Sequence, residues 1–196
     1  MYSKELREKY LRALEPRLTP KRLRHSLGVE KMAGQLAKEY GEDPQKAEIA
    51  GLLHDYAKYI PDEQMLEYAK KFGIALCPAY EEKPNLMHGP VGAKLVEQEL
   101  GICDPQILRA IALHTTGAWG MNKLEEILYL ADLLEEGRDF EGVSQLRKVL
   151  KEKGPEETMI CALERELEFL QARGSTIHPN TQGAYEWMKQ KKEKQG

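Results

Sequence analysis

Apolar residues along this chain recur every three or four positions, with short polar breaks between the runs. Leu6, Tyr10 and Leu14 share one face of a first helix, and Pro16 ends that helix. No segment alternates apolar and polar residues between hairpin turns, so no strand is predicted. The pattern therefore predicts an all-α protein.

Local start and stop signals divide the chain into further helices. Thr19-Pro20 is a capping residue followed by proline at the first helical position, and Gly41 ends the same helix. Asn122 with Glu125 forms a capping-box pattern. Residues 74–87 are the least regular part, and a loop is expected there. Helices are expected over about 20–40, 44–55, 62–72, 90–100, 105–114, 123–136, 143–151 and 155–172, and after 179.

The length and composition fit one globular domain. The chain has 196 residues, of which 41% are hydrophobic and 31% charged, enough for one substantial core. It contains no internal repeat, no linker between domains and no signal-type segment at the N-terminus. We expect a single domain over 1–196, with a core over about 20–172. Residues 173–196 should form a C-terminal turn, a helix and a solvated basic tail that includes Lys189 to Lys194.

The charge and the cysteine content limit which kinds of partner the protein can bind and in which cellular compartment it is expected. The net charge of −3 disfavours a protein that coats nucleic acid, although bound cations can still attract an anionic small molecule. No apolar run is long enough to span a membrane. Cys77, Cys103 and Cys161 are an odd, scattered set without metal-site spacing. These features predict a cytoplasmic protein that binds neither nucleic acid nor membranes.

The adjacent side chains His54 and Asp55 end the apolar run 49–53 and are the strongest candidates for chemistry. Imidazole and carboxylate groups together suit divalent iron, manganese or zinc. Adjacent helical positions point about 100° apart. One ion would not easily take both groups, whereas two neighbouring ions could share the carboxylate. The pair therefore indicates a metal-dependent hydrolase.

Other histidines and aspartates join this pair on separate helices. Each has a plain structural explanation when taken alone: His25 as a half-buried histidine, His88 as a capping residue, Asp132 as half of a salt bridge. An unpaired carboxylate in the apolar run around Asp132 would cost several kcal/mol. Together the groups indicate a metal centre, whereas His178 in its polar turn is interpreted as structural. The candidate ligands are His25, His54, Asp55, His88, His114 and Asp132.

The order His, His-Asp, Asp resembles the HD-domain phosphohydrolases, in which helices converge on a metal centre. The segments 51–58, 131–143 and 176–181, with His88 and His114, resemble the bacterial YqeK-type HD proteins over roughly residues 20–190. This resemblance implies a helical bundle of HD-domain type and a di-iron centre held by the six candidates. It also implies symmetrical hydrolysis of diadenosine tetraphosphate to two ADP. Glu136 and Glu141 depart from the family, because many members have proline there.

The resemblance further implies which side chains act on the substrate. The residues expected to be catalytic are Asp55, Lys58 and Arg138. The positive side chains of Lys58 and Arg138 should neutralise charge on the polyphosphate. For any single lysine or arginine, plain surface charge is the competing explanation. Thr115 and Thr116 could supply hydroxyl donors, or they could form an ordinary turn at a helix end. The expected substrate-binding residues are Arg22, His25, Lys58, His88, Thr115, Thr116 and Arg138.

Several alternatives stay open at this point. Another HD hydrolase could act on a nucleoside monophosphate, a deoxynucleotide or a cyclic dinucleotide. A non-catalytic regulator could use the same fold to bind an ADP-like nucleotide. Manganese or zinc could take the place of iron. A possible homodimer could use apolar positions in 74–87, and the same segment could equally form a lid.

Overall fold

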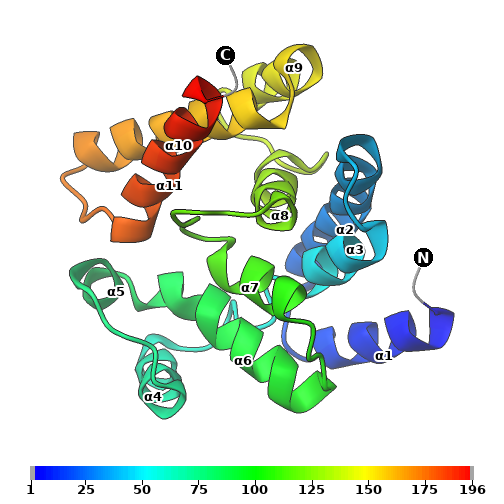
Figure 1. The fold of residues 1–196 in the computed structure, drawn as a ribbon. Helices are drawn as coiled ribbons and strands as arrows, with labels where there is room; N and C mark the ends of the chain where they lie inside the picture. The colour runs from blue at the N-terminus through cyan, green and yellow to red at the C-terminus, as the bar shows by residue number, and fades with distance from the viewer. Residues whose placement is uncertain (1–2, 195–196) are drawn as a thin grey trace.

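The structure, a computed structural model, describes residues 3–194 and shows an all-α fold (Figure 1). Within this range the chain forms helices and no strand. The all-α prediction is confirmed. The elements are α1 Lys4–Leu14, α2 Pro20–Tyr40, α3 Pro44–Leu53, α4 Asp62–Phe72, α5 Pro78–Glu82, the 3-10 turn η1 Pro84–Met87, α6 His88–Leu100, α7 Pro105–Leu113, α8 Lys123–Leu134, α9 Val143–Lys153, α10 Pro155–Ala172 and α11 Pro179–Glu193.

The predicted capping signals act where the sequence places them. Thr19 Oγ1 accepts from the backbone N–H of Arg22, and Gly41 ends α2 in the left-handed conformation with φ 69°. Asn122 and Glu125 form the reciprocal capping box at the start of α8. Because caps depend on residues three or four apart, these boundaries could be predicted from the sequence alone.

Two helices end earlier than predicted. Helix α3 stops at Leu53, so His54 is its C-cap and Asp55 lies in the turn that follows. Turn hydrogen bonds replace the helical pattern there, with Lys58 N donating to Asp55 O at 2.9 Å. Helix α8 ends at Leu134 rather than Glu136, since Glu135 turns to an extended conformation with ψ 154°. Both changes place site residues at helix ends, where their side chains can turn inward.

The segment 74–87 is not the simple loop that was predicted. Pro78 opens the short helix α5 and Pro84 opens η1. Proline at the first position of a helical turn loses no hydrogen bond, because the N–H it lacks would be unpaired there. These short turns lead directly into α6, which begins at His88, two residues before Pro90.

The basic C-terminal segment is helical rather than frayed and is largely exposed as predicted, with Lys191 as the half-buried exception. Helix α11 continues to Glu193. Lys191 Nζ lies 2.8 Å from Glu126 Oε1 on α8 and 2.9 Å from Glu156 Oε1 on α10. The carboxylate of Glu126 is buried, and an opposite charge offsets the cost of its desolvation.

Among residues 3–194, no helix is both long and apolar enough to span a bilayer.

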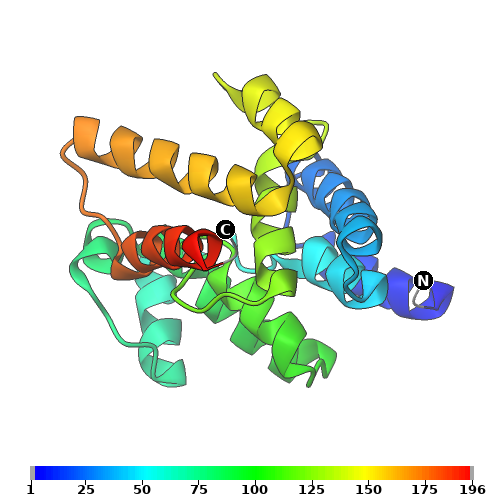
Figure 2. The same cartoon turned by 45° about the horizontal axis from the view of Figure 1, so that its top comes forward.

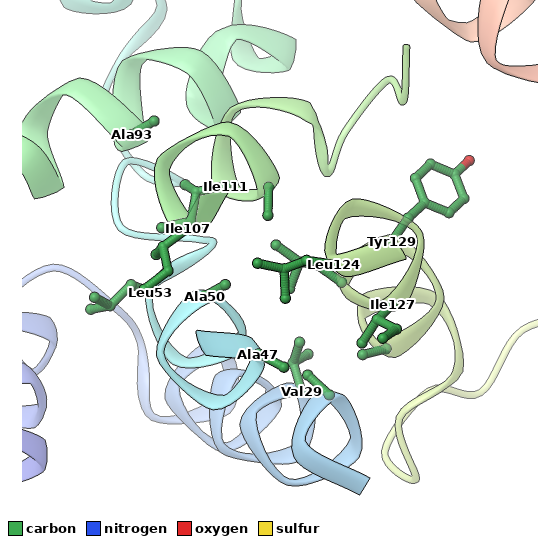
Figure 3. Packing of buried hydrophobic residues seen from close by; sticks show 14 of the residues in the cluster. Val29, Ala47, Ala50, Leu53, Ala93, Ile107, Ile111, Leu124, Ile127 and Tyr129 are labelled. Atoms are coloured by element: carbon green, nitrogen blue, oxygen red, sulfur yellow. The ribbon is translucent and has the colours of Figure 1, made fainter. Parts of the chain in front are cut away.

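Helix α8 lies at the centre of the fold and packs against α2, α3, α7 and α10 (Figure 1). Apolar side chains from these helices fill the space between them, among them Val29, Ala50, Ile111 and Leu124 (Figure 3). Helices α10 and α11 lie against one another on one side of α8 (Figure 2). The core thereby holds the inner ends of several helices close to one point.

Two glycines allow the helices that carry the histidines to approach closely. A Cβ on Gly51 of α3 would lie 2.9 Å from the Val29 carbonyl oxygen of α2. A Cβ on Gly89 of α6 would lie 2.8 Å from the Ala112 carbonyl oxygen of α7. A side chain at either position would push the backbones apart. The close contacts bring α2 to α3 and α6 to α7, the two helix pairs from which the histidines come.

Candidate metal centre

The six predicted ligands meet at one point although they come from five separate segments. His25 lies in α2, His54 and Asp55 follow α3, and His88 begins α6. His114 caps the end of α7, and Asp132 lies in the last turn of α8. They form three overlapping groups whose ligand atoms lie within 4.8 Å of one another: His25, His54 and Asp55; His54, His114 and Asp132; and Asp55, His88 and His114.

Hydrogen bonds fix the tautomer of each of the four histidines. The Nδ1 atoms of His54, His88 and His114 each lie 2.6–2.7 Å from the carbonyl oxygen three residues earlier. A carbonyl oxygen can only accept, so each Nδ1 carries the proton. His25 Nδ1 lies 2.9 Å from a carboxylate oxygen of Glu135, which likewise accepts. In the neutral form of each ring, the Nε2 atoms, which face one another, therefore carry the lone pairs.

These facing lone pairs fit a cation. His88 Nε2 and His114 Nε2 lie 3.0 Å apart, and His54 Nε2 is buried without a hydrogen-bond partner. Imidazole nitrogens bind a zinc-sized ion at about 2.0–2.1 Å, so two that share one ion at a right angle lie about 3.0 Å apart. Unprotonated nitrogens at this distance repel one another unless a cation lies beside them. The residues present fit divalent metal.

Asp55 divides its two carboxylate oxygens between two groups of ligands. Oδ2 lies 3.2 Å from His54 Nε2 and 3.8 Å from His25 Nε2. Oδ1 lies 3.1 Å from His88 Nε2 and 3.9 Å from His114 Nε2. On the first side, Asp132 Oδ1 lies 2.9 Å from His25 Nε2. This arrangement fits two neighbouring cations with Asp55 between them.

Burial and charge prepare these groups to bind a cation. Burial lowers the pKa of His114 to about 3, and His88 and His54 contribute to the same shift, so its ring is neutral at physiological pH. Burial alone would raise the pKa of Asp55, but His54 and His88 outweigh it and hold the pKa well below its usual range. For His54, burial lowers the pKa, yet Asp55 and Asp132 raise it overall, which favours the protonated ring, and a bound cation would displace that proton. The neutral ring of His114 and the ionised carboxylate of Asp55 are the protonation states that ligation requires.

Three cationic side chains surround the centre. Arg22 Nη1 lies 3.0 Å from Asp55 Oδ2, and Lys58 Nζ lies 3.3 Å from His88 Nε2. Arg138 contacts Asp132 through Nη2 and donates from Nε to the Asp132 carbonyl at 2.7 Å. Burial lowers the pKa of Lys58. All three cations line an open cavity of about 260 Å³ that reaches the centre.

The two threonines predicted to contact substrate lie in different places. Thr115 lines the cavity, and its hydroxyl donates to the Leu86 carbonyl at 3.1 Å. Thr116 is buried, and its hydroxyl donates to the Gly117 carbonyl at 3.0 Å. Thr116 is not among the residues that line the cavity. The position of Thr115 suits a substrate contact, and that of Thr116 suits a structural turn.

Sequence reasoning missed four polar side chains around the centre. Glu135 contacts His25, and Asn85, Tyr129 and Glu166 line the cavity. Tyr129 also belongs to the buried hydrophobic cluster (Figure 3). Glu135 lies within the segment that carries the family resemblance, so its position held a signal. Glu166 lies on α10, between the resembling segments 131–143 and 176–181, and no local pattern singles it out.

A match to a known protein family decides to which family the chain belongs. A family model described as "HD domain" matches residues 22–137, which carry all six candidate ligands. The chain belongs to the HD-domain family.

Similarity to individual HD proteins extends over nearly the whole chain. The protein is 39% identical to "Bis(5'-nucleosyl)-tetraphosphatase, symmetrical" of Bacillus subtilis, over 93% of this chain and 97% of that protein. It is 38% identical to the protein of the same name from Halalkalibacterium halodurans, over 91% and 95%. The crystal structure of a "predicted HD superfamily hydrolase involved in NAD metabolism" from Clostridium acetobutylicum superposes with a TM-score of 0.90. It is 37% identical and covers 97% of this chain and 99% of that one.

His178 lies apart from the HD centre, and we expect His178→Ala to keep its metal content. Its Nδ1 accepts from the Asn180 backbone N–H at 3.1 Å at the start of α11, and its ring packs on Tyr80. Loss of this cap should cost about 1 kcal/mol of stability. Metal analysis and thermal unfolding of the variant check both expectations. Loss of one equivalent of metal would contradict the structural role.

Proposed function

We propose that this HD protein hydrolyses diadenosine tetraphosphate and related dinucleoside polyphosphates symmetrically, giving two ADP. The observation that carries this proposal is the match to symmetrical tetraphosphatases over more than nine-tenths of both chains. The converging His and Asp side chains and the cation-lined cavity support it, since both suit a polyanionic substrate.

We propose that two divalent cations occupy the centre. His25, His54 and Asp132 would hold one, His88 and His114 the other, and Asp55 would bridge them. When bound, the cations supply Lewis acidity that activates water and neutralises phosphate oxygens. We further propose that the pair is di-iron, as the family resemblance implies, with manganese or zinc as alternatives. Metal analysis of protein purified without chelator tests the identity of the ions.

The chain's own cations would bind and orient the polyphosphate. Arg22, Lys58 and Arg138 face the same cavity and carry three positive charges. Arg138 can offer two N–H groups to one phosphate, a bidentate contact that fixes direction as well as charge. The ammonium of Lys58 would offset charge that develops on the leaving oxygen. We include Thr115 in the substrate site and leave Thr116 out, because the Thr116 hydroxyl is buried against Gly117.

In the proposed reaction, a water oxygen bonds to one inner phosphorus of the tetraphosphate. The bond from that phosphorus to the central bridging oxygen breaks, and this oxygen leaves with the second ADP. The protons of the water pass to the leaving oxygen or to solvent. The proposed catalytic residues are Asp55, Lys58 and Arg138. Asp55 would act by holding the cations, and Lys58 and Arg138 would act by contacting the phosphates.

The products distinguish this reaction from its alternatives. Hydrolysis in ¹⁸O-labelled water should give ADP alone, with one labelled oxygen on the terminal phosphate of half of the ADP molecules. Chromatography followed by mass spectrometry measures both. Equal amounts of ATP and AMP would show cleavage of an outer P–O–P bridge and contradict the proposal.

Two competing activities are tested with the same preparation. Turnover of mononucleotides, deoxynucleotides or cyclic dinucleotides in preference to the tetraphosphate would identify another HD hydrolase. Tight ADP binding without turnover, in protein loaded with iron under reducing conditions, would identify a regulator.

We propose that residues 1–196 form one domain, although the family model ends at 137. Glu166 of α10 lines the cavity, and Arg147 of α9 donates to the Leu134 and Glu135 carbonyls beside the centre. The C-terminal helices therefore support the site rather than follow it as a separate unit. The homodimer and the cytoplasmic location stay predictions.

A further inference from the structure

Glu135 connects the metal centre to the loop that carries Arg138. Its side chain is buried just after α8, with the residue only 4% exposed. Oε1 lies 2.9 Å from His25 Nδ1, and Oε2 accepts from the backbone N–H of Gly137 at 2.6 Å. One carboxylate thus holds a ligand ring on one side and the 135–138 loop on the other.

Two glycines leave the space that this carboxylate occupies. A Cβ on Gly28 would lie 2.5 Å from Glu135 Oε2, and one on Gly137 would lie 3.0 Å from the same atom. Gly28 follows His25 by three residues on α2, so both face Glu135 from the same side of the helix. The sequence of α2 therefore provides both the ring and the room for its partner.

His25 needs a side-chain partner because of its position in its helix. His54 and His114 follow the ends of α3 and α7, where the last backbone carbonyls have no helical partner and can accept from Nδ1. His25 is inside α2, where the neighbouring carbonyls already accept from helical N–H groups. The carboxylate of Glu135, at the end of α8, therefore accepts from His25 Nδ1 in place of a backbone carbonyl.

The loop after Glu135 is held from its other side as well. Arg147 donates to the carbonyl oxygens of Glu135 at 2.6 Å and of Arg138 at 3.0 Å. Arg138 in turn contacts both Asp132 and, at 3.4 Å, His25 Nε2. Movement of the Glu135 carboxylate would therefore disturb the His25 ring and the Arg138 loop together.

We propose that Glu135 is a positioning residue that fixes the Nδ1–H tautomer and the ring orientation of His25 and ties them to the loop presenting Arg138. The inference rests on the role of His25 as a ligand in the proposed function. Loss of such an outer partner typically lowers metal affinity by roughly 10- to 100-fold. Glu135 is a positioning rather than a catalytic residue, because its carboxylate contacts His25 and Gly137, belongs to none of the candidate ligand groups and does not line the cavity.

The first test is titration of Mn²⁺ into metal-stripped protein, followed by calorimetry. Glu135→Ala should weaken the site that contains His25 by roughly 10- to 100-fold and leave the other site near its wild-type affinity. Glu136→Gln is the matched control, because the neighbouring Glu136 side chain is 85% exposed and pairs with Lys31 at the surface. Unchanged affinity in Glu135→Ala, or an equal loss in Glu136→Gln, would overturn the proposal.

Gly28→Ala separates positioning from folding. The added methyl displaces the flexible end of Glu135 while the side chains of both Glu135 and His25 are retained. Alanine is favoured over glycine inside a helix by about 1 kcal/mol, which offsets part of the cost of displacing the carboxylate, so the metal-free variant should still fold and unfold cooperatively. Weaker Mn²⁺ binding in a variant that unfolds cooperatively supports the proposal, and wild-type binding contradicts it. This variant decides the question if Glu135→Ala does not fold.

The histidine tautomer provides a readout that a purely structural role would not move. Long-range ¹H–¹⁵N spectra of the metal-free protein should show His25 with its proton on Nδ1, the signal being assigned by its loss in His25→Gln. In Glu135→Ala we expect a mixture of tautomers, and an unchanged spectrum would count against the proposal. If the wild type binds Mn²⁺ as described but leaves diadenosine tetraphosphate intact, the proposed function fails and the role of Glu135 stands.

Discussion

Asp55→Ala is expected to remove both metal binding and hydrolysis. Asp55 is the one ligand whose two oxygens face both groups of histidines, so its loss disrupts both cation positions. Lewis-acid stabilisation by bound metal contributes several kcal/mol to such a reaction, which corresponds to a loss of at least about a thousandfold in turnover. His54→Ala should remove one equivalent of metal and most of the activity. Metal analysis and product formation from diadenosine tetraphosphate measure both effects.

Asp139→Asn serves as the control for this substitution. Asp139 is exposed and lies close to the site in the sequence, but outside the three ligand groups. Its replacement should leave metal content and turnover unchanged. If Asp55→Ala kept full activity and full metal content, the assignment of the centre would be wrong.

Arg138→Ala is expected to lower kcat/KM by about 10- to 100-fold while the metal stays bound. A charge-assisted hydrogen bond to phosphate contributes roughly 1.5–3 kcal/mol, and that energy corresponds to this range of rates. Arg138 lines the cavity and contacts Asp132, but its guanidinium is a cation and cannot itself be a ligand. Kinetics and metal content should be measured on the same sample.

Arg24→Ala is the matched control for Arg138. Arg24 precedes His25 in the sequence, yet its side chain is exposed and does not line the cavity. We expect wild-type kinetics for this variant. Wild-type kinetics in Arg138→Ala would show that Arg138 is only a surface charge. Loss of metal from this variant would show that the arginine supports the ligands instead.

The sequence by itself determined the helical class and most helix boundaries, and it predicted the side chains that the structure brings together as candidate ligands. Caps such as Thr19 and the Asn122–Glu125 box involve residues three positions apart, so local sequence specifies them. The six ligands could be named because the resemblance to HD proteins rests on residue types at ordered positions. The angle between adjacent helical positions predicted that Asp55 could lie between two ions, and this stays a prediction; the structure places the two Asp55 oxygens near different histidines.

Only the tertiary structure decided which other groups join the site. Glu135 and His25 are 110 residues apart, and their contact depends on how α2 packs against α8. Thr115 and Thr116 are neighbours in the sequence, yet one faces the cavity and the other a buried carbonyl. Lys191 is half-buried rather than solvated, because its ammonium group forms ion pairs with Glu126 and Glu156 on two other helices. Local signals set where helices begin and end, whereas contacts between remote segments arise from core packing, which no short stretch of sequence encodes.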